Sequence, residues 1–258
     1  MSAPLLEVER LQVSISGQAI VRDISFAVAA GEKLALVGES GSGKTVTALS
    51  LLRLFHGAQV DGHAWFGEAA QRRDLLTLSE RRLRAVRGDE IAMIFQEPMS
   101  ALNPLMTVGT QIAEVLQLKR ATTGNAAMQG AVELLARMGL DRPAERAAVY
   151  PHQLSGGMRQ RVGLARALAI DAEIILMDEA FSALDPLIRY DMQDELLKLQ
   201  QQLHKTIVFV THDIGEALRL GDHIVILRDG RVEQAGSPQG IIARPANDYV
   251  RRFVMRRE

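Results

Sequence analysis

The sequence GESGSGKT at residues 38–45 determines how the rest of the chain is interpreted. It follows an apolar run at residues 34–37 that predicts a buried strand, and it precedes residues 46–55, whose apolar side chains recur at helical spacing. Glycines in such a turn let backbone N–H groups surround a phosphate chain, and the following helix adds its partial positive charge. In this pattern, Lys44 reaches the β- and γ-phosphates and Thr45 binds Mg²⁺. The loop itself consists of Gly38, Glu39, Ser40, Gly41, Ser42 and Gly43. The stretch therefore predicts a site for a nucleoside triphosphate and its Mg²⁺.

Composition restricts the possible classes of protein. The chain has 258 residues, of which 47% are hydrophobic and 24% charged, enough for one large domain or two small ones. A net charge of −1 argues against a general nucleic-acid binder, so we expect no nucleic-acid partner. The absence of cysteine excludes disulfides, thiol catalysis and cysteine-bound metals. No apolar run is long enough to span a bilayer, and residues 1–10 do not resemble a signal peptide. If the protein acts at a membrane, we expect it to act from the cytoplasmic side through a partner protein.

The periodicity of apolar residues predicts a parallel α/β core interrupted by helices. Alternation at residues 5–14 and 23–28 indicates antiparallel strands joined by a turn at residues 16–18. Residues 56–67 form a polar, glycine-dotted stretch, and residues 74–87 predict a surface helix. A short strand is expected at residues 91–95 and helices at about 98–169, with a loop at residues 122–125. Further strands are expected at residues 173–179 and 205–210, a helix from Asp185 and Pro186, and a tight hairpin at residues 228–230.

Acidic residues and a histidine follow two of these strands. Asp178 ends an apolar strand, where a phosphate-loop protein places the carboxylate that binds Mg²⁺. Glu179 comes next and can act as the general base that activates a water for attack on the γ-phosphate. His212 lies at the carboxyl end of another strand, where doubly wound sheets bind ligands, and can contact the γ-phosphate. Each residue has a plain structural explanation as well, a solvated turn for the acids and a capping or core role for the histidine.

Residues 154–161, LSGGMRQR, give the chain a family resemblance. They resemble the LSGGQ signature of the ATP-binding subunits of ABC transporters, with methionine where glutamine is commonest. The phosphate loop, Gln96, the signature, the acidic pair, SALD at residues 182–185 and Thr211-His212 follow the order of that family. The resemblance implies a single ABC ATPase domain over residues 1–258, a P-loop NTPase with a RecA-like parallel-sheet core. It also implies an N-terminal antiparallel β subdomain and a helical subdomain at about residues 97–169.

The resemblance assigns further roles. Gln96 belongs to the loop that senses Mg²⁺ and the transmembrane partner. Ser155, Gly156 and Gly157 would bind the γ-phosphate held by a second ATP-binding subunit, so that ATP is hydrolysed in a head-to-tail homodimer or heterodimer. Asp185 belongs to the loop that crosses this interface. Permease subunits, an extracytoplasmic binding protein and a peripheral position on the cytoplasmic face of the inner membrane are also implied.

Two positions depart from the family pattern. Ile15 lies where the family has an aromatic residue that stacks on adenine, and such stacking contributes about 1–3 kcal/mol per base, so ATP affinity is expected to be weaker. Ala180 replaces the proline that usually follows the catalytic glutamate.

The resemblance changes along the chain. Residues 5–118, including the run from Ile94 to Gly109, resemble ATPases of dipeptide, oligopeptide and nickel importers, whereas residues 150–253 resemble those of glycine betaine/proline importers. The chain thus reads as a mosaic, arisen by recombination or as a divergent subfamily. We expect the energy-coupling ATPase of a peptide or nickel importer, with a betaine/proline importer as the alternative. A soluble superfamily member acting on ribosomes or DNA, and a mosaic that binds ATP without a matching permease, are the other hypotheses.

Overall fold

The computed structural model describes residues 3–68, 71–96, 102–120, 122–182 and 184–255. These residues form two compact units. Unit 1 comprises residues 1–85 and 204–258, and unit 2 comprises residues 86–203, so the second is an insertion in the sequence of the first. The predicted segments at residues 97–101 and at Ala183 lie outside the described residues.

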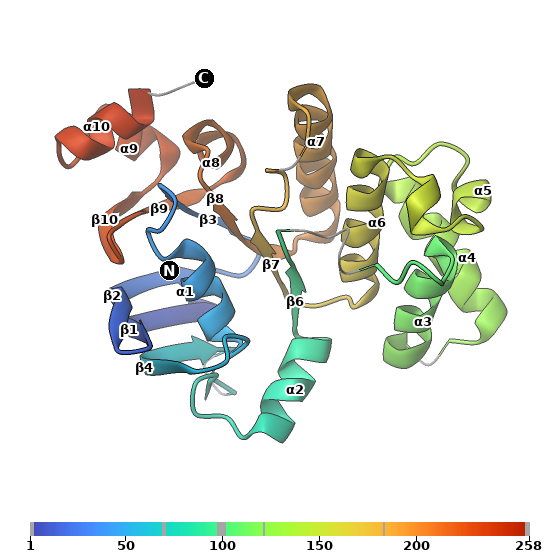
Figure 1. The fold of residues 1–258 in the computed structure, drawn as a ribbon, viewed down its shortest axis with the longest axis horizontal. Coiled ribbons are helices and arrows are strands. Elements are labelled where there is room, and N and C mark those ends of the chain that lie inside the picture. The colour runs from blue at the N-terminus through green and yellow to red at the C-terminus, as the bar shows by residue number, and fades with distance from the viewer. Residues whose placement is uncertain (1–2, 69–70, 97–101, 121, 183, 256–258) are drawn as a thin grey trace. The chain divides into compact units, whose positions relative to one another are not determined.

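An antiparallel sheet forms the N-terminal part of unit 1 (Figure 1). Its strands have the order β2-β1-β4-β5, with bounds β1 (Leu6–Ile15), β2 (Gln18–Val28), β4 (Ala58–Phe66) and β5 (Arg73–Asp74). Leu6, Val8, Leu11 and Val13 of β1 are buried and alternate with more exposed residues, as the sequence predicts. The structure therefore confirms the two antiparallel strands and the turn between them.

Strand β4 corrects the interpretation of residues 56–67 as a polar, glycine-dotted stretch. Its glycine, Gly62, has φ +101°, and a Cβ there would lie 2.5 Å from the carbonyl oxygen of Arg10. Arg10 itself has φ 49°, and the β1–β4 register shifts between Glu9 and Gln12. The glycine thus accommodates an irregularity of the neighbouring strand instead of ending its own strand.

The second sheet of unit 1 carries the phosphate loop. Its strands have the order β10-β9-β3-β8, where β3 (Lys33–Gly38) pairs in parallel with both β8 (Thr206–Thr211) and β9 (His223–Arg228). Leu34 to Val37 of β3 are fully buried, which explains the continuous apolar run. Strand β10 (Arg231–Gly236) returns antiparallel through Asp229 and Gly230, whose φ values of 49° and 76° fit the predicted tight hairpin.

Helices complete unit 1. They are α1 (Lys44–Leu51), α8 (Ile214–Leu220), α9 (Pro238–Ala243) and α10 (Asp248–Met255). Helix α1 is shorter than the predicted 46–55, because Arg53 adopts a left-handed backbone with φ 49°. The predicted helix at 74–87 begins later, as α2 (Glu80–Asp89), because the buried Asp74 belongs to β5 and accepts hydrogen bonds from the backbone N–H groups of Ala64 and Leu76.

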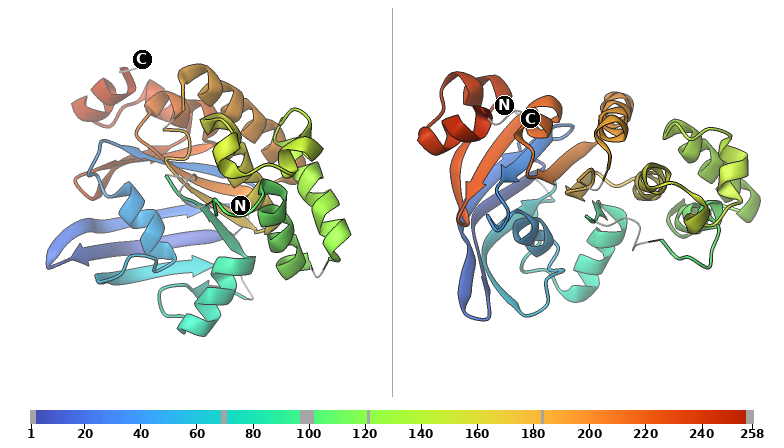
Figure 2. Two further views of the ribbon diagram at one scale, coloured as in Figure 1. Left: turned by 45° about the vertical axis from the view of Figure 1, so that its right-hand side comes forward. Right: turned by 45° about the horizontal axis from the view of Figure 1, so that its top comes forward.

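Unit 2 contains one parallel strand pair and a group of helices (Figure 2). Strands β6 (Ile91–Ile94) and β7 (Ile174–Asp178) pair in parallel register, as predicted from their apolar runs. The helices are α3 (Val108–Arg120), α4 (Gly124–Arg137), α5 (Pro143–Ala147), the 3₁₀ turn η1 (Pro151–Gln153), α6 (Gly156–Ala169) and α7 (Pro186–Leu203). The predicted helical insert and the helix start at Pro186 are confirmed. Within the described residues, none of the helices has the length and apolar character needed to cross a bilayer.

Candidate functional site

The phosphate loop of unit 1 has the predicted form of strand, glycine turn and helix. It leaves β3 at Gly38 and enters α1 at Lys44, with Gly43 as the N-cap in a left-handed conformation (φ 94°). A Cβ at Gly38 would lie 2.2 Å from the carbonyl oxygen of Leu227 on the paired strand β9. Gly38 is therefore required for the close approach of two strands, and Gly43 for the turn into the helix.

Lys44 is held inside this loop. Its side chain is 4% exposed, and Nζ donates hydrogen bonds to the carbonyl oxygens of Gly38 and Glu39, each at 2.9 Å. A phosphate group that entered the loop would replace these carbonyls as the partner of the ammonium group, with a stronger charge-assisted bond. Ser42 also supports phosphate binding by this loop, because its buried hydroxyl has no hydrogen-bond partner among the described residues. Thr45 follows on the first turn of α1 and is half-buried.

His212 follows the strand next to the phosphate loop. Strand β8 ends at Thr211, which pairs with Val37 of β3, and His212 is the next residue and is exposed. The Thr211 hydroxyl accepts a hydrogen bond from the N–H of Asp213 (3.0 Å), and the Asp213 carboxylate caps α8. These contacts fix the turn that presents His212 at the carboxyl end of the parallel strands.

The acidic pair lies at the end of β7 in unit 2. Asp178 is the last residue of the strand and is 4% exposed, whereas Glu179 is half-buried and has a left-handed backbone with φ 44°. Gln96 follows β6, the paired strand, and its Nε2 donates to Oε2 of Glu179 at 3.4 Å. The structure thus brings together two residues that the sequence separates widely.

The turn after Glu179 is held by side chains whose part in this turn the sequence does not predict. The Glu179 carbonyl oxygen accepts hydrogen bonds from the N–H (3.0 Å) and hydroxyl (2.8 Å) of Ser182. The buried Gln160 on α6 donates its Nε2 to the carbonyl oxygen of Ala180. Arg189 donates to the carbonyl oxygens of Ser182 and Leu184, both at 3.2 Å. Gln160 and Ser182 belong to the motifs at residues 154–161 and 182–185, and Arg189 lies just after them, but each role depends on a contact formed by folding.

The signature residues begin α6. Ser155 is the N-cap, and its Oγ accepts a hydrogen bond from the N–H of Met158 at 3.3 Å. Ser155 and Gly156 are exposed, so the positive end of a 14-residue helix faces solvent. Gly157 is buried, and a Cβ there would lie 2.7 Å from Cγ2 of Ile188 on α7. Asp185 is also exposed, immediately before α7.

The oxygen donors suit Mg²⁺. Thr45 offers a hydroxyl, Asp178 a carboxylate and Gln96 an amide oxygen, all of which are hard ligands. Mg²⁺ is typically bound by one or two protein groups together with nucleotide phosphates and water. Thr45 of unit 1, and Asp178 and Gln96 of unit 2, each carry a donor of the kind that Mg²⁺ binds.

Ile15, the residue that the family resemblance places against adenine, has no aromatic residue as a direct strand partner. Ile15 is half-buried and pairs with Gln18 of β2 and Ala58 of β4. Trp65 of β4 pairs with Glu7, near the opposite end of β1, and so cannot replace the missing ring.

Comparisons with known proteins agree with this geometry. The ABC transporter family matches residues 21–182. The chain is 46% identical over 237 residues to the glycine betaine/proline betaine transport system ATP-binding protein ProV of Salmonella typhimurium, covering 90% of this chain and 55% of that protein. It is 39% identical over 254 residues to a Brucella abortus ATP-binding protein that carries a name for peptide import, covering 95% of this chain and 75% of that protein. The chain spans about half the length of several curated relatives that it matches.

A solved structure has the same fold. It is a dimeric ATP-binding cassette in a post-hydrolysis state with ADP and Pi, 30% identical, with a TM-score of 0.78 over 90% of this chain and 98% of that chain. The agreement confirms the predicted fold class, with its parallel core, antiparallel strands and helical insert.

Proposed function

The chain belongs to the ABC transporter family, and we propose that it hydrolyses ATP as the energy-coupling subunit of an importer. The observation that carries the proposal is the buried ammonium of Lys44, held by the carbonyl oxygens of its own glycine loop at the start of α1. Release of phosphate from Mg-ATP tests it. We expect turnover by the parent protein and a loss of about 10²–10⁴-fold in Glu179→Gln, the usual contribution of a general base. Equal turnover by both proteins would show that Glu179 is not the base.

Each site residue has a proposed role. The loop from Gly38 to Thr45 binds the phosphates, and Lys44 neutralises their charge. Thr45, Asp178 and Gln96 are the proposed ligands of Mg²⁺, directly or through water. The metal would stabilise negative charge on the phosphates during transfer.

The proposed chemistry then depends on two further side chains. Glu179 accepts the proton of the attacking water, and His212 hydrogen-bonds the γ-phosphate. The exposed position of His212 and the hydrogen bond between Gln96 and Glu179 support these roles.

The active species that we propose is a dimer formed with ATP. Ser155 and Gly156 are exposed at the positive end of α6, and Gly157 lets that helix pack closely on α7. The signature residues and Asp185 would contact the nucleotide bound by a second subunit. The related solved cassette is dimeric, which supports this arrangement. Size-exclusion chromatography with light scattering of Glu179→Gln tests this. We expect a dimer with ATP and a monomer without it, whereas a monomer under both conditions would contradict the proposal.

For the importer class, we propose peptides or nickel first. The segment from Gln96 to Gly109 follows β6 in the sequence, and the family resemblance assigns it to contact with the permease. The higher identity to the betaine protein, 46% against 39%, favours the alternative of a glycine betaine/proline importer. Co-expression with each type of permease, followed by affinity capture, distinguishes the two. Capture by the betaine-type permease alone would overturn the first choice, and capture by neither would favour a mosaic that binds ATP without a permease.

Partners and location follow from the importer proposal. Permease subunits and an extracytoplasmic binding protein would complete the transporter, with this chain on the cytoplasmic face of the membrane. A single cassette over residues 1–258 with a helical subdomain at about 97–169 remains part of the same proposal.

A further inference from the structure

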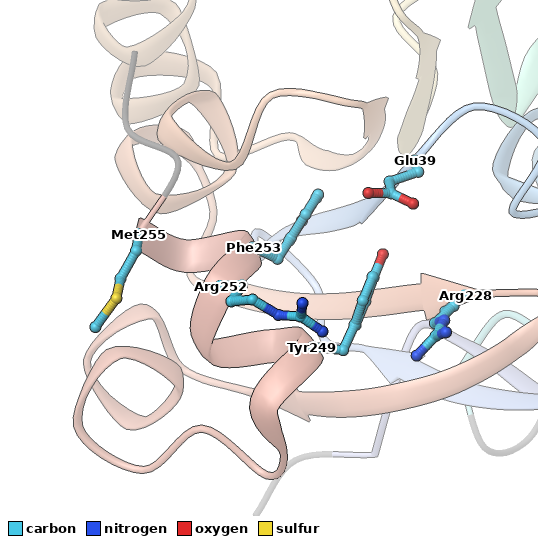
Figure 3. A pocket seen from close by; sticks show the side chains of 6 residues that line it. All are labelled: Glu39, Arg228, Tyr249, Arg252, Phe253 and Met255. Carbon is cyan, nitrogen blue, oxygen red and sulfur yellow. The ribbon is translucent and has the colours of Figure 1, made fainter.

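A pocket lies beside the phosphate loop, within unit 1 (Figure 3). It has a volume of about 410 Å³, within the range of small-molecule sites. Its lining comes from the phosphate loop, the end of β9 and helix α10. The residues are Glu39, Arg228, Tyr249, Arg252, Phe253 and Met255.

The wall formed by α10 is aromatic. The rings of Tyr249 and Phe253 are stacked with centroids 5.8 Å apart and an interplanar angle of 12°. The guanidinium carbon of Arg228 lies 4.5 Å from the centroid of the Tyr249 ring, a cation–π contact that holds the ring in place. Such a surface suits the flat apolar body of a ligand.

The polar groups of the pocket suit an anion. The Tyr249 hydroxyl is shielded from solvent and has no hydrogen-bond partner among the described residues, and Figure 3 shows it directed toward the side of Glu39. Two guanidinium groups and one carboxylate line the pocket, which leaves one formal positive charge. The carboxylates of Asp229 and Glu233 lie outside the lining but are close enough to act on the Tyr249 hydroxyl, and Asp229, which is 82% exposed, lies 3.4 Å from Nε of Arg228. The hydroxyl and the two guanidinium groups can each donate hydrogen bonds. Such donors suit an anionic acceptor, which is a carboxylate, sulfonate or phosphate.

We propose that this pocket is a binding site for a small amphipathic monoanion, with its flat apolar part on the rings of α10 and its anionic group at Tyr249 and the arginines. The site is distinct from the nucleotide site but shares Glu39 with it. The Glu39 carboxylate lines the pocket, while its carbonyl oxygen accepts a hydrogen bond from Lys44. Any change that one ligand makes in the affinity of the other must be matched by the same factor in the reverse direction.

The probe for the test is 6-fluoro-2-naphthoate, followed by fluorine NMR, with 6-fluoro-2-naphthamide as the neutral counterpart. We expect the naphthoate to bind and the amide to bind at least about tenfold more weakly, because a hydrogen bond to a charged group is stronger than a neutral one. Tyr249→Phe keeps the ring and should weaken naphthoate binding about tenfold. Glu39→Gln should strengthen it, because it removes the one carboxylate of the lining. Equal binding of the two probes, or equal naphthoate affinity in all variants, would overturn the proposal.

A matched pair on α10 separates the pocket from the general surface charge of the helix. Arg252→Gln changes a lining residue, whereas Arg251→Gln changes a neighbour whose guanidinium pairs with Asp248 outside the pocket. Only Arg252→Gln should weaken naphthoate binding.

Lys44→Ala distinguishes the pocket from the nucleotide site, because it should lose ATP and retain naphthoate. Loss of naphthoate binding in Lys44→Ala, or complete displacement of naphthoate by a non-hydrolysable ATP analogue, would place the probe in the nucleotide site and overturn the proposal.

Discussion

Replacing Glu179 with glycine should give a more stable protein than replacing it with alanine, and both variants should lose catalysis. The backbone of Glu179 is left-handed, with φ 44°, a conformation that costs a side-chain-bearing residue about 1–2 kcal/mol. Glycine adopts it without that cost but makes the unfolded chain more flexible, which offsets about 0.4–1 kcal/mol. The net gain in the free energy of unfolding should be about 0.5–1 kcal/mol relative to Glu179→Ala, which loses the same carboxylate but keeps the strained backbone.

Equilibrium unfolding in urea measures this difference, and a thermal scan should show a Tm higher by about 1–4 °C for the glycine variant. Phosphate release should fall about 10²–10⁴-fold in both variants, because both lack the proposed general base. A glycine variant no more stable than the alanine variant would refute the reasoning, since it would mean that Glu179 pays no conformational cost in the native state.

Three further changes test the site and the pocket. Lys44→Ala should lose binding of a fluorescent ATP analogue, because the phosphates lose their charge-assisted partner, and retained affinity would contradict the role of Lys44. Gly38→Ala should lower the free energy of unfolding by about 1–3 kcal/mol, because its Cβ would lie 2.2 Å from the Leu227 carbonyl oxygen; urea unfolding equal to the parent would argue against this strand contact. Burial, and next the Glu39 carboxylate, raise the pKa of Tyr249 above the usual 10.0, so the native state retains a proton that the unfolded state loses. The contribution of the Tyr249 hydroxyl to the free energy of unfolding should therefore be constant below about pH 10. Above that pH the free energy of unfolding should fall, and it should fall more steeply in the parent than in Tyr249→Phe.

Local sequence patterns predicted much of this protein. The sequence predicts the phosphate loop, the buried strand that ends at the acidic pair and the Asp229-Gly230 hairpin, because glycine backbone freedom and apolar periodicity act over a few neighbouring residues. The order of the motifs then indicated the family. None of these inferences required knowledge of contacts between distant segments.

Long-range contacts decided the remaining features. Strand β4 was missed because its glycine signalled a break, whereas in the fold Gly62 accommodates the irregular backbone at Arg10. The start of α2 was misplaced because the burial of Asp74 depends on its hydrogen bonds in the sheet.

The same reason applies to the candidate site and the pocket. The left-handed turn at Glu179 is fixed by Gln160 and Ser182, and neither contact has a spacing that a single sequence reveals. The pocket joins Glu39 to Tyr249, residues near opposite ends of the chain. The sequence alone therefore determines which reactive and binding residues the chain carries. The tertiary structure decides which other side chains position them, because packing acts between residues that are distant along the chain.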